Sequence, residues 1–349
     1  MEKIRTYLNK IKHSLIKWRL VLSIILTILV LFIFLRHFDF QLLFNSIMSV
    51  NPIYVIIAIF FFVFSLILYS WRWKIILDGK KKVNSYTLFE AVLLSHFANI
   101  LLPVNVGELF RAFYLKSKTG IKLSLIFGTI ASERLYRLFG YILALVFVIF
   151  FVDIPKSLPV FSYGFILLAL IIIIIFICLV LLSILISLNK KKVAKYSEKV
   201  LQIFYKPRKI KYSEFISNFI SGIKFGSSIS DKILIIILTV ITKVMYAFIM
   251  QLVALSFGIY LPLYSFILID VIVSFIHFVG NGILGIGASY EFAMAFSMTL
   301  YGASKELGLG VAIILDLVYI IPILVWSLFY FKREGFAQFK KFFGKDTYY

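Results

Sequence analysis

The chain has 349 residues, of which 62% are hydrophobic, 18% are aromatic and only 15% are charged. Ordinary globular domains are about 45–50% apolar and about 25% charged, so this composition, with a mean hydropathy of +1.01, excludes a typical soluble protein. The formal net charge of +21 would indicate nucleic-acid binding in a soluble protein. Here the basic residues flank apolar stretches, which argues against nucleic acid as a partner.

In chain order, six apolar stretches are long enough to cross a membrane. A helix needs about 20 residues to cross the roughly 30 Å of hydrocarbon in a bilayer. We therefore predict an all-α, polytopic integral membrane protein. Its six full spans are expected at residues 20–36, 52–70, 123–152, 160–188, 233–257 and 307–331.

The segments that carry most of the basic residues lie between or beyond these spans. Cytoplasmic loops of membrane proteins carry an excess of Lys and Arg. We therefore expect a multi-pass protein of the plasma membrane with both termini in the cytoplasm. The basic segments are a cytoplasmic N-terminus at 1–19, a loop at 71–87, a cytoplasmic loop at 189–232 and a cytoplasmic tail at 332–349.

Two apolar segments do not fit this topology as single spans. Residues 88–110 begin and end next to basic stretches, and residues 263–303 have to begin and end on the outer side. Each is expected to fold as a re-entrant hairpin, and the two hairpins enter from opposite faces. A first repeat, 52–152, then matches a second repeat, 233–331, in the reverse direction. Such an inverted repeat, within a transmembrane domain of residues 20–331, is a recurrent architecture of secondary transporters.

Both expected hairpins contain a helix break that a glutamate follows, Glu108 in the first and Glu291 in the second. Non-helical backbone at membrane depth is tolerated only where it is buried in protein or lines a water-filled cavity. Glycines also permit close helix packing, and that explanation stays open. A glutamate after each break nevertheless favours a functional site. The break residues are Pro103, Asn105 and Gly107 in the first hairpin, and Gly282, Gly285 and Gly287 in the second.

Three arginines near these carboxylates are candidates for binding a lipid phosphate. Arg111 follows Glu108 by three residues, so both can share one helical face, and Glu133 and Arg137 have the i,i+4 spacing of an intrahelical ion pair. Arg134 lies near the middle of its span, where an unpaired arginine is costly. Guanidinium groups are suited to bidentate contact with phosphate. A self-neutralising cluster of salt bridges is the alternative.

Lys243 and Asp316 are two further charges that fall near the centres of their spans. Because an isolated charge at membrane depth is costly, we expect them to pair with each other, or each with another buried charge such as Glu291. Together with Glu108 and Glu133, these residues are expected to neutralise or gate the site.

Sequence motifs for nucleotide, dinucleotide, serine-hydrolase or zinc-protease chemistry do not occur in the chain. No catalytic residue, metal site or cofactor is therefore expected. The loop at 189–232 is too short for a soluble catalytic domain. Its basic, partly amphipathic character suits either a helix that lies on anionic head groups or a plain cytoplasmic loop.

Three motifs resemble a known family. "LPVNVGELFRAFYL" and the "SERLYRLFG" that follows it are similar to the paired signature of the lysylphosphatidylglycerol synthase transmembrane-region family, also called flippase-like integral membrane proteins. "GNGILGIGASYE" resembles the glycine-rich turn in the second half of that family. Asn105 stands where the family often has a basic residue. The resemblance implies the flippase-like half of the bifunctional members without their soluble aminoacyl-transferase domain.

The favoured hypothesis is a transporter that moves a lipid with an anionic head group between leaflets. The lipid is either a phospholipid or a polyprenyl-phosphate-linked lipid. Such membrane lipids are the expected partners, and a homodimer or a separately encoded synthase partner stays open. Two alternatives remain. One is a membrane-embedded glycosyl or aminoacyl transferase that modifies lipids, and the other is a non-catalytic partner of such a synthase.

Overall fold

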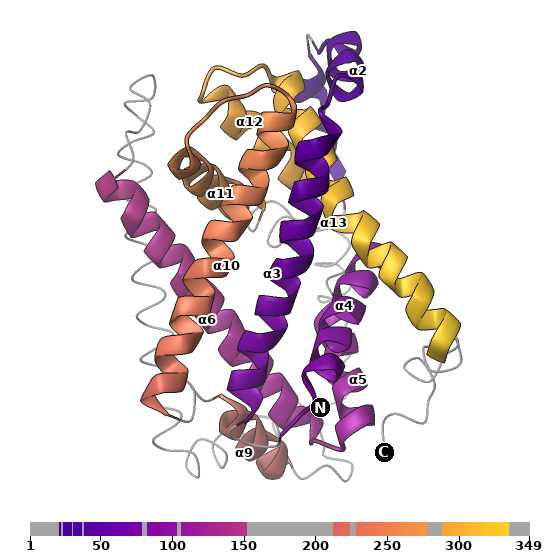
Figure 1. Cartoon of the computed structure of the whole chain (residues 1–349), viewed down its shortest axis with the longest axis vertical. Coiled ribbons are helices and arrows are strands. Elements are labelled where there is room, and N and C mark those ends of the chain that lie inside the picture. The colour runs from indigo at the N-terminus through magenta and orange to yellow at the C-terminus, as the bar shows by residue number, and fades with distance from the viewer. Residues whose placement is uncertain are drawn as a thin grey trace, which may run out of the picture. The chain divides into compact units, whose positions relative to one another are not determined.

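The described part of the chain is built from helices. The computed structural model describes residues 21, 24–29, 31–36, 38–78, 82–102, 106–151, 212–223, 228–277 and 288–334. Within these residues there is no β-strand, which confirms the predicted all-α class. The helices, drawn in Figure 1, are α2 (Phe40–Met48), α3 (Pro52–Asp78), α4 (Ser85–Leu101), α5 (Gly107–Thr119), α6 (Leu123–Phe151), α9 (Tyr212–Gly222), α10 (Ile229–Ser256), α11 (Leu263–His277), α12 (Ser289–Thr299) and α13 (Lys305–Glu334).

Four of these helices, α3, α6, α10 and α13, are long and apolar enough to cross a membrane. They coincide with four of the six predicted spans and confirm a polytopic membrane protein. A fifth candidate is a bent pair, in which Ile24–Leu35 and Phe40–Met48 meet at 81°. Its first helix falls on the first predicted span, residues 20–36, and its second helix, α2, lies beyond that span. The span predicted at 160–188 lies outside the described residues.

Helix α3 is longer than the sequence predicted. Its span was expected to end at residue 70 and to lead into a basic loop, but the helix continues to Asp78. Arg72, which was expected in that loop, is therefore helical and only 3% exposed. The loop prediction was wrong here because a run of charged residues lowers the local hydropathy, although the charge of Arg72 is paired inside the protein.

Each of the two predicted hairpins appears as a pair of short helices. Helix α4 packs against α5, and α11 packs against α12. The longest of the four has 17 residues, which is short of the about 20 needed to cross a bilayer. These lengths fit re-entrant hairpins, but re-entry and the inverted repeat stay predictions. The break residues Pro103, Asn105, Gly282, Gly285 and Gly287 lie outside the described residues.

Gly107 determines how closely α4 and α5 approach. A Cβ atom at this position would lie 2.1 Å from the backbone oxygen of Ser95 and 2.6 Å from Oδ1 of Asn99. The backbone N–H of Gly107 also donates a 2.8 Å hydrogen bond to the same Asn99 oxygen. The close-packing explanation therefore holds for Gly107, the one break glycine within the described residues.

Helix α9 lies within the loop predicted at 189–232, and it packs against α6. A Cβ atom on Gly128 of α6 would lie 2.7 Å from the Cα atom of Gly222, so the two helices touch through glycine. At the start of this contact, Lys122 Nζ lies 2.6 Å from Glu214 Oε1, and both side chains are exposed. The described part of the loop is thus a helix packed on the protein and not a plain loop.

The chain divides into two compact units. Unit 1 consists of Met1–Ala58, Val152–Leu158 and Ala247–Leu317, and unit 2 of Ile59–Phe151, Pro159–Tyr246 and Val318–Tyr349. Among the described residues, unit 1 contains α2, α11 and α12, and unit 2 contains α4, α5, α6 and α9. The long helices α3, α10 and α13 contribute a segment to each unit.

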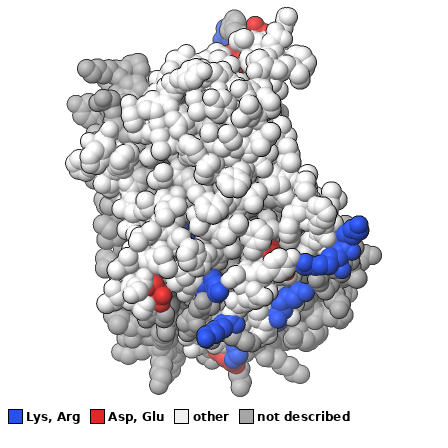
Figure 2. All heavy atoms as spheres, viewed as in Figure 1, with Lys and Arg blue, Asp and Glu red and all other residues white. Residues whose placement is uncertain are grey.

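The outer surface of the described helices is largely apolar. Phe150 on α6 and Leu328 on α13 are 76% and 73% exposed. Figure 2 shows a face on which most described side chains are uncharged and most of the visible Lys and Arg side chains lie in the lower part. Large exposed apolar areas mark surfaces that contact membrane or other proteins. This surface therefore suits helices surrounded by lipid.

Candidate functional site

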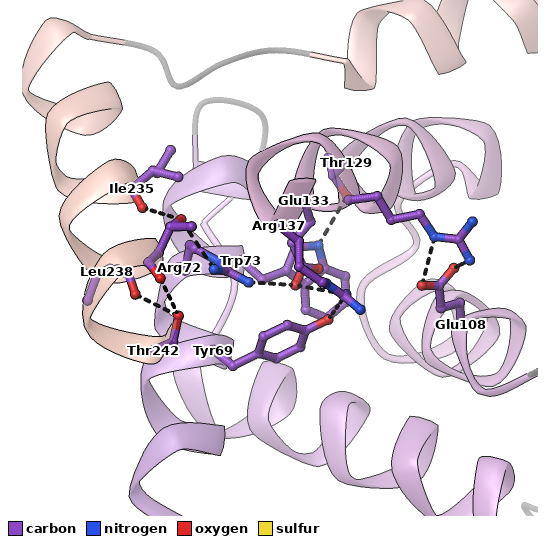
Figure 3. A network of polar contacts seen from close by, with 12 residues as sticks. Tyr69, Arg72, Trp73, Glu108, Thr129, Glu133, Arg137, Ile235, Leu238 and Thr242 are labelled. Atoms are coloured by element: carbon purple, nitrogen blue, oxygen red, sulfur yellow. Dashed lines mark hydrogen bonds and ion pairs between the residues drawn. The ribbon is translucent and has the colours of Figure 1, made fainter. Parts of the chain in front are cut away.

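Glu133 on α6 is the centre of a polar cluster in unit 2. Its side chain is completely buried, and two buried arginines reach it from other helices. Nη2 of Arg111, on α5, lies 2.8 Å from Oε2, and Nη2 of Arg72, on α3, lies 3.4 Å from Oε1. Arg137, one turn further along α6, places Nη2 4.0 Å from Oε1. Figure 3 shows Arg72 and Arg137 together with Glu133 and Tyr69.

The cluster carries an excess of positive charge. Arginine stays protonated in proteins, so three guanidinium groups on one carboxylate leave two positive charges in excess. Buried charges are costly unless they are paired. A salt-bridge cluster is present, as the alternative interpretation of the sequence expected, but it is not neutral. Such an excess of buried positive charge is suited to an anion.

Buried donors without a partner lie in the same cluster. Arg72 Nε, Arg111 Nε and Arg111 Nη2 have no hydrogen-bond acceptor among the described residues, and Glu133 Oε2 has no donor. The 2.8 Å contact between Arg111 and Glu133 is therefore an ion pair without a directed hydrogen bond. A buried polar group without a partner costs about 1–3 kcal/mol. An anion with several oxygens would satisfy these donors.

Tyr69 on α3 contacts all three arginines. Its hydroxyl oxygen accepts hydrogen bonds from Arg111 Nη1 at 2.9 Å and from Arg137 Nη2 at 3.0 Å. The centre of its ring lies 5.2 Å from the guanidinium carbon of Arg72. The ring of Trp73 lies 4.3 Å from the guanidinium carbon of Arg111. Aromatic rings at these distances stabilise cations through their negative faces, so Tyr69 and Trp73 partly offset the excess charge.

Two threonines hold the α3 side chains in place. Arg72 Nη1 donates to Thr239 Oγ1 on α10 at 3.2 Å, and Trp73 Nε1 donates to Thr129 Oγ1 on α6 at 3.2 Å. A Cβ atom on Gly140 of α6 would lie 2.8 Å from Cγ2 of Thr239, so α6 and α10 approach closely beside the cluster. Helices α3, α5, α6 and α10 thus all contribute to its geometry.

A second ion pair forms the rim of the cluster. Arg134 Nε donates to Glu108 Oε1 at 3.0 Å, and Arg134 Nη2 pairs with Glu108 Oε2, which makes a bidentate contact between α5 and α6. Arg134 is 61% exposed and Arg137 is 45% exposed. Arg111 and Glu108 both lie on α5 at the predicted i,i+3 spacing, and Arg111 pairs with Glu133. Among the predicted phosphate ligands, Arg134 is already neutralised, whereas Arg111 and Arg137 belong to the cluster with excess charge.

Three residues of the site, Tyr69, Arg72 and Trp73, were not predicted from the sequence. They stand at positions i, i+3 and i+4 of α3, which is one helical face. This spacing was visible in the sequence, but Tyr69 was placed at the end of the predicted span and Arg72 and Trp73 in the loop after it. Glu90 on α4 was also missed. It is 4% exposed, accepts a 2.5 Å hydrogen bond from the Tyr114 hydroxyl and pairs with Arg333 on α13.

The predicted carboxylates of the second repeat lie in unit 1. Glu291 stands in the first turn of α12 and Asp316 on α13, and both side chains are half-buried. Among the described residues, neither takes part in an ion pair within 4.0 Å. Lys243 belongs to unit 2, where Nζ lies 3.2 Å from the centre of the Tyr141 ring. The pairing of Lys243 with Asp316 stays a prediction.

The polar groups of the cluster are chemically suited to an anion and not to a cation. Guanidinium groups and a tyrosine hydroxyl donate hydrogen bonds to oxygen, and the guanidinium group has no acceptor with which to ligate a cation. Within the part of the chain that the structure describes, no group of three His, Cys, Asp or Glu side chains could hold a metal ion.

Comparisons with known proteins identify one family. The model of the family described as "Lysylphosphatidylglycerol synthase TM region" matches residues 20–327. UPF0104 membrane protein MJ1595 of Methanocaldococcus jannaschii is 32% identical over 117 residues, which cover 32% of this chain and 35% of the relative. UPF0104 membrane protein MJ1078 of the same organism is 34% identical over 99 residues, 27% of this chain and 42% of the relative. The matches thus cover less than half of each relative's length. No solved structure matches.

Proposed function

The chain belongs to the lysylphosphatidylglycerol synthase transmembrane-region family, and on this premise we propose that it moves a lipid with an anionic head group between the leaflets of the plasma membrane. The proposal rests on one observation. Arg72, Arg111 and Arg137 surround the single carboxylate of Glu133 and leave two positive charges in excess.

The residues of the cluster have distinct roles in this proposal. Arg72 and Arg111, which are 3% and 1% exposed, supply positive charge at the buried end of the site. Arg137, which is 45% exposed, is the first guanidinium that a head group meets. Glu133 keeps the arginines together when no lipid is bound, and a phosphate takes over part of that task. Guanidinium groups suit this exchange because they bind phosphate and carboxylate in the same bidentate manner.

The rim pair supplies the gate. Arg134 and Glu108 connect α6 to α5, the second helix of the first hairpin, and both are at least partly exposed. A head group that enters beside Arg137 competes with Glu108 for Arg134, which loosens α5 from α6. In inverted-repeat transporters one repeat rocks or gates against the other, and in this proposal the helix pairs α4–α5 and α11–α12 belong to the two repeats. In this proposal both termini face the cytoplasm, as the basic segments predict.

A leaflet-exposure assay in proteoliposomes tests the proposal. Fluorescent phosphatidylglycerol and a fluorescent polyprenyl phosphate are compared, and the wild-type protein is expected to move at least one of them between leaflets and to leave phosphatidylcholine in place. Arg137→Gln removes one charge of the excess, and the rate should fall about tenfold or more, because a hydrogen bond to a charged group is worth about 1.5–3 kcal/mol. Lys122→Gln is the matched control, because Lys122 is an exposed cation that pairs with Glu214 outside the cluster.

Two results would contradict the proposal. In one, wild-type vesicles behave like empty vesicles both without a gradient and with proton or sodium gradients of either direction. In the other, Arg137→Gln and Lys122→Gln move the anionic lipid that the wild type moves, and both do so at the wild-type rate.

A further inference from the structure

We infer that the lipid bound at this cluster carries a phosphate monoester, a dianionic head group, and not a phosphodiester. The inference rests on the proposed function and specifies its substrate class. Phosphatidic acid and polyprenyl monophosphates share this head-group chemistry.

The first argument is the charge of the site. Arg72, Arg111 and Arg137 against Glu133 leave two positive charges in excess. The rim pair of Arg134 and Glu108 adds one charge of each sign and leaves this excess unchanged. A phosphate monoester carries about −1.5 to −2 at pH 7, which matches the excess, whereas a phosphodiester carries a single negative charge and leaves one buried positive charge without a partner.

The second argument is the geometry of the donors. Arg111 Nη1 and Arg137 Nη2 converge on the hydroxyl oxygen of Tyr69, at 2.9 and 3.0 Å. Two guanidinium groups thus donate to one neutral hydroxyl oxygen. A charged phosphate oxygen in its place would form a stronger hydrogen bond with each of the two arginines. Arg111 Nε and Arg72 Nε are further buried donors without an acceptor among the described residues. A monoester offers three terminal oxygens to these three guanidinium groups, and a diester offers two.

The third argument is burial. Exposure decreases from 45% at Arg137 to 1% at Arg111 and 3% at Arg72, so a head group that passes Arg137 reaches donors shielded from water. The rings of Tyr69 and Trp73 lie against these guanidinium groups and help to exclude water. Charge interactions are stronger where the local dielectric constant is low. The difference of one charge between the two lipid classes therefore counts more here than on an exposed surface.

Lipid binding to the full chain in phosphatidylcholine nanodiscs tests the inference separately from transport. Phosphatidic acid, a polyprenyl monophosphate and phosphatidylglycerol are titrated, and the thermal midpoint of the protein is followed against lipid content. At least one monoester is expected to bind about tenfold or more tightly than phosphatidylglycerol, since one additional charge-assisted contact is worth about 1.5–3 kcal/mol. The comparison of the two monoesters shows whether the head group alone or also the chain is recognised.

Variants of the exposed arginine complete the experiment. Arg137→Gln reduces the excess to one charge, so the preference for monoesters should fall to within about threefold. Arg137→Lys keeps the charge and should retain most of the preference for monoesters. A purely structural role of Arg137 would not explain this result. Arg72→Gln removes a different charge and should reduce the preference for monoesters to the same extent. It takes the place of Arg137→Gln if that variant does not fold. Lys122→Gln should keep the wild-type preference.

Each outcome has one meaning. Equal affinity of wild type for the monoesters and for phosphatidylglycerol overturns the inference, and the proposed function stands if phosphatidylglycerol moves between leaflets. Tight monoester binding without movement of any lipid supports the inference and overturns the proposed transport. An unchanged preference in both Arg137→Gln and Arg72→Gln also overturns the inference, because the excess charge would then not select the lipid.

Discussion

Glu133 and its three arginines respond differently to substitution, although they form one cluster. Removing an arginine lowers the positive excess, whereas removing the carboxylate raises it from two charges to three. Removing one partner of a buried ion pair is destabilising because the remaining charge stays buried in the protein without compensation. At the residue scale the cluster is therefore held by Glu133, and the arginines supply its capacity for an anion.

Glu133→Gln is expected to destabilise the protein by about 3–5 kcal/mol, which is the usual cost of an uncompensated buried charge. Arg72→Gln should cost less, because Glu133 keeps Arg111 at 2.8 Å. The measurement is the thermal midpoint of the purified protein in detergent. Glu214→Gln is the control, since this exposed carboxylate pairs with the exposed Lys122 away from the cluster, and it should change little. Equal midpoints for Glu133→Gln and Glu214→Gln would contradict the central role of Glu133.

The helix pair α4–α5 is the element that positions Arg111. The two helices approach so closely at Gly107 that its N–H binds the side chain of Asn99. Helix α5 ends at Gly120, whose left-handed φ of 68° turns the chain toward α6. Arg111 lies one turn after Gly107, so any change in the crossing of α4 and α5 moves its guanidinium group relative to Glu133.

Gly107→Ala is expected to separate α4 from α5, because the new Cβ atom would lie 2.1 Å from the Ser95 backbone oxygen. Overpacking of this kind costs about 1–3 kcal/mol or more. The thermal midpoint should fall, and lipid movement should fall with it because Arg111 is displaced. Ser117→Ala on the exposed face of α5 is the control and should leave both unchanged. If Gly107→Ala lowered neither quantity, the hairpin would tolerate a wider crossing than its structure shows.

At the scale of the whole molecule, hydropathy predicted the spans α3, α6, α10 and α13, because a long apolar run has few alternatives to a membrane helix. The resemblance predicted the family. The partners of the buried charges could not be predicted. Arg72 pairs with Glu133 across 61 residues and Arg134 with Glu108 across 26. Such pairs depend on which helix faces contact each other, and these contacts cannot be read from the sequence alone.

The opposite orientation of the two hairpins is the prediction that belongs to the whole chain. Lys82, before α4, and Lys118, in the last turn of α5, flank the first pair of short helices. Tyr260, before α11, and Thr299, at the end of α12, flank the second pair. All four side chains are exposed. If basic segments face the cytoplasm, the first two positions are cytoplasmic and the last two are external.

Single cysteines at these four positions, in a chain whose one native cysteine is changed by Cys178→Ser, test this arrangement. A membrane-impermeant maleimide added to intact cells should label Tyr260→Cys and Thr299→Cys, and it should label Lys82→Cys and Lys118→Cys only after the membrane is opened. Labelling of all four from one side would refute the inverted repeat, because both hairpins would then open to the same face. Labelling of Lys82→Cys and Lys118→Cys from different sides would show that α4 and α5 cross the membrane together as one broken span. Arg111 and Glu108 would then lie on a helix that passes through the bilayer, and the gate between α5 and α6 would have to work without a returning hairpin.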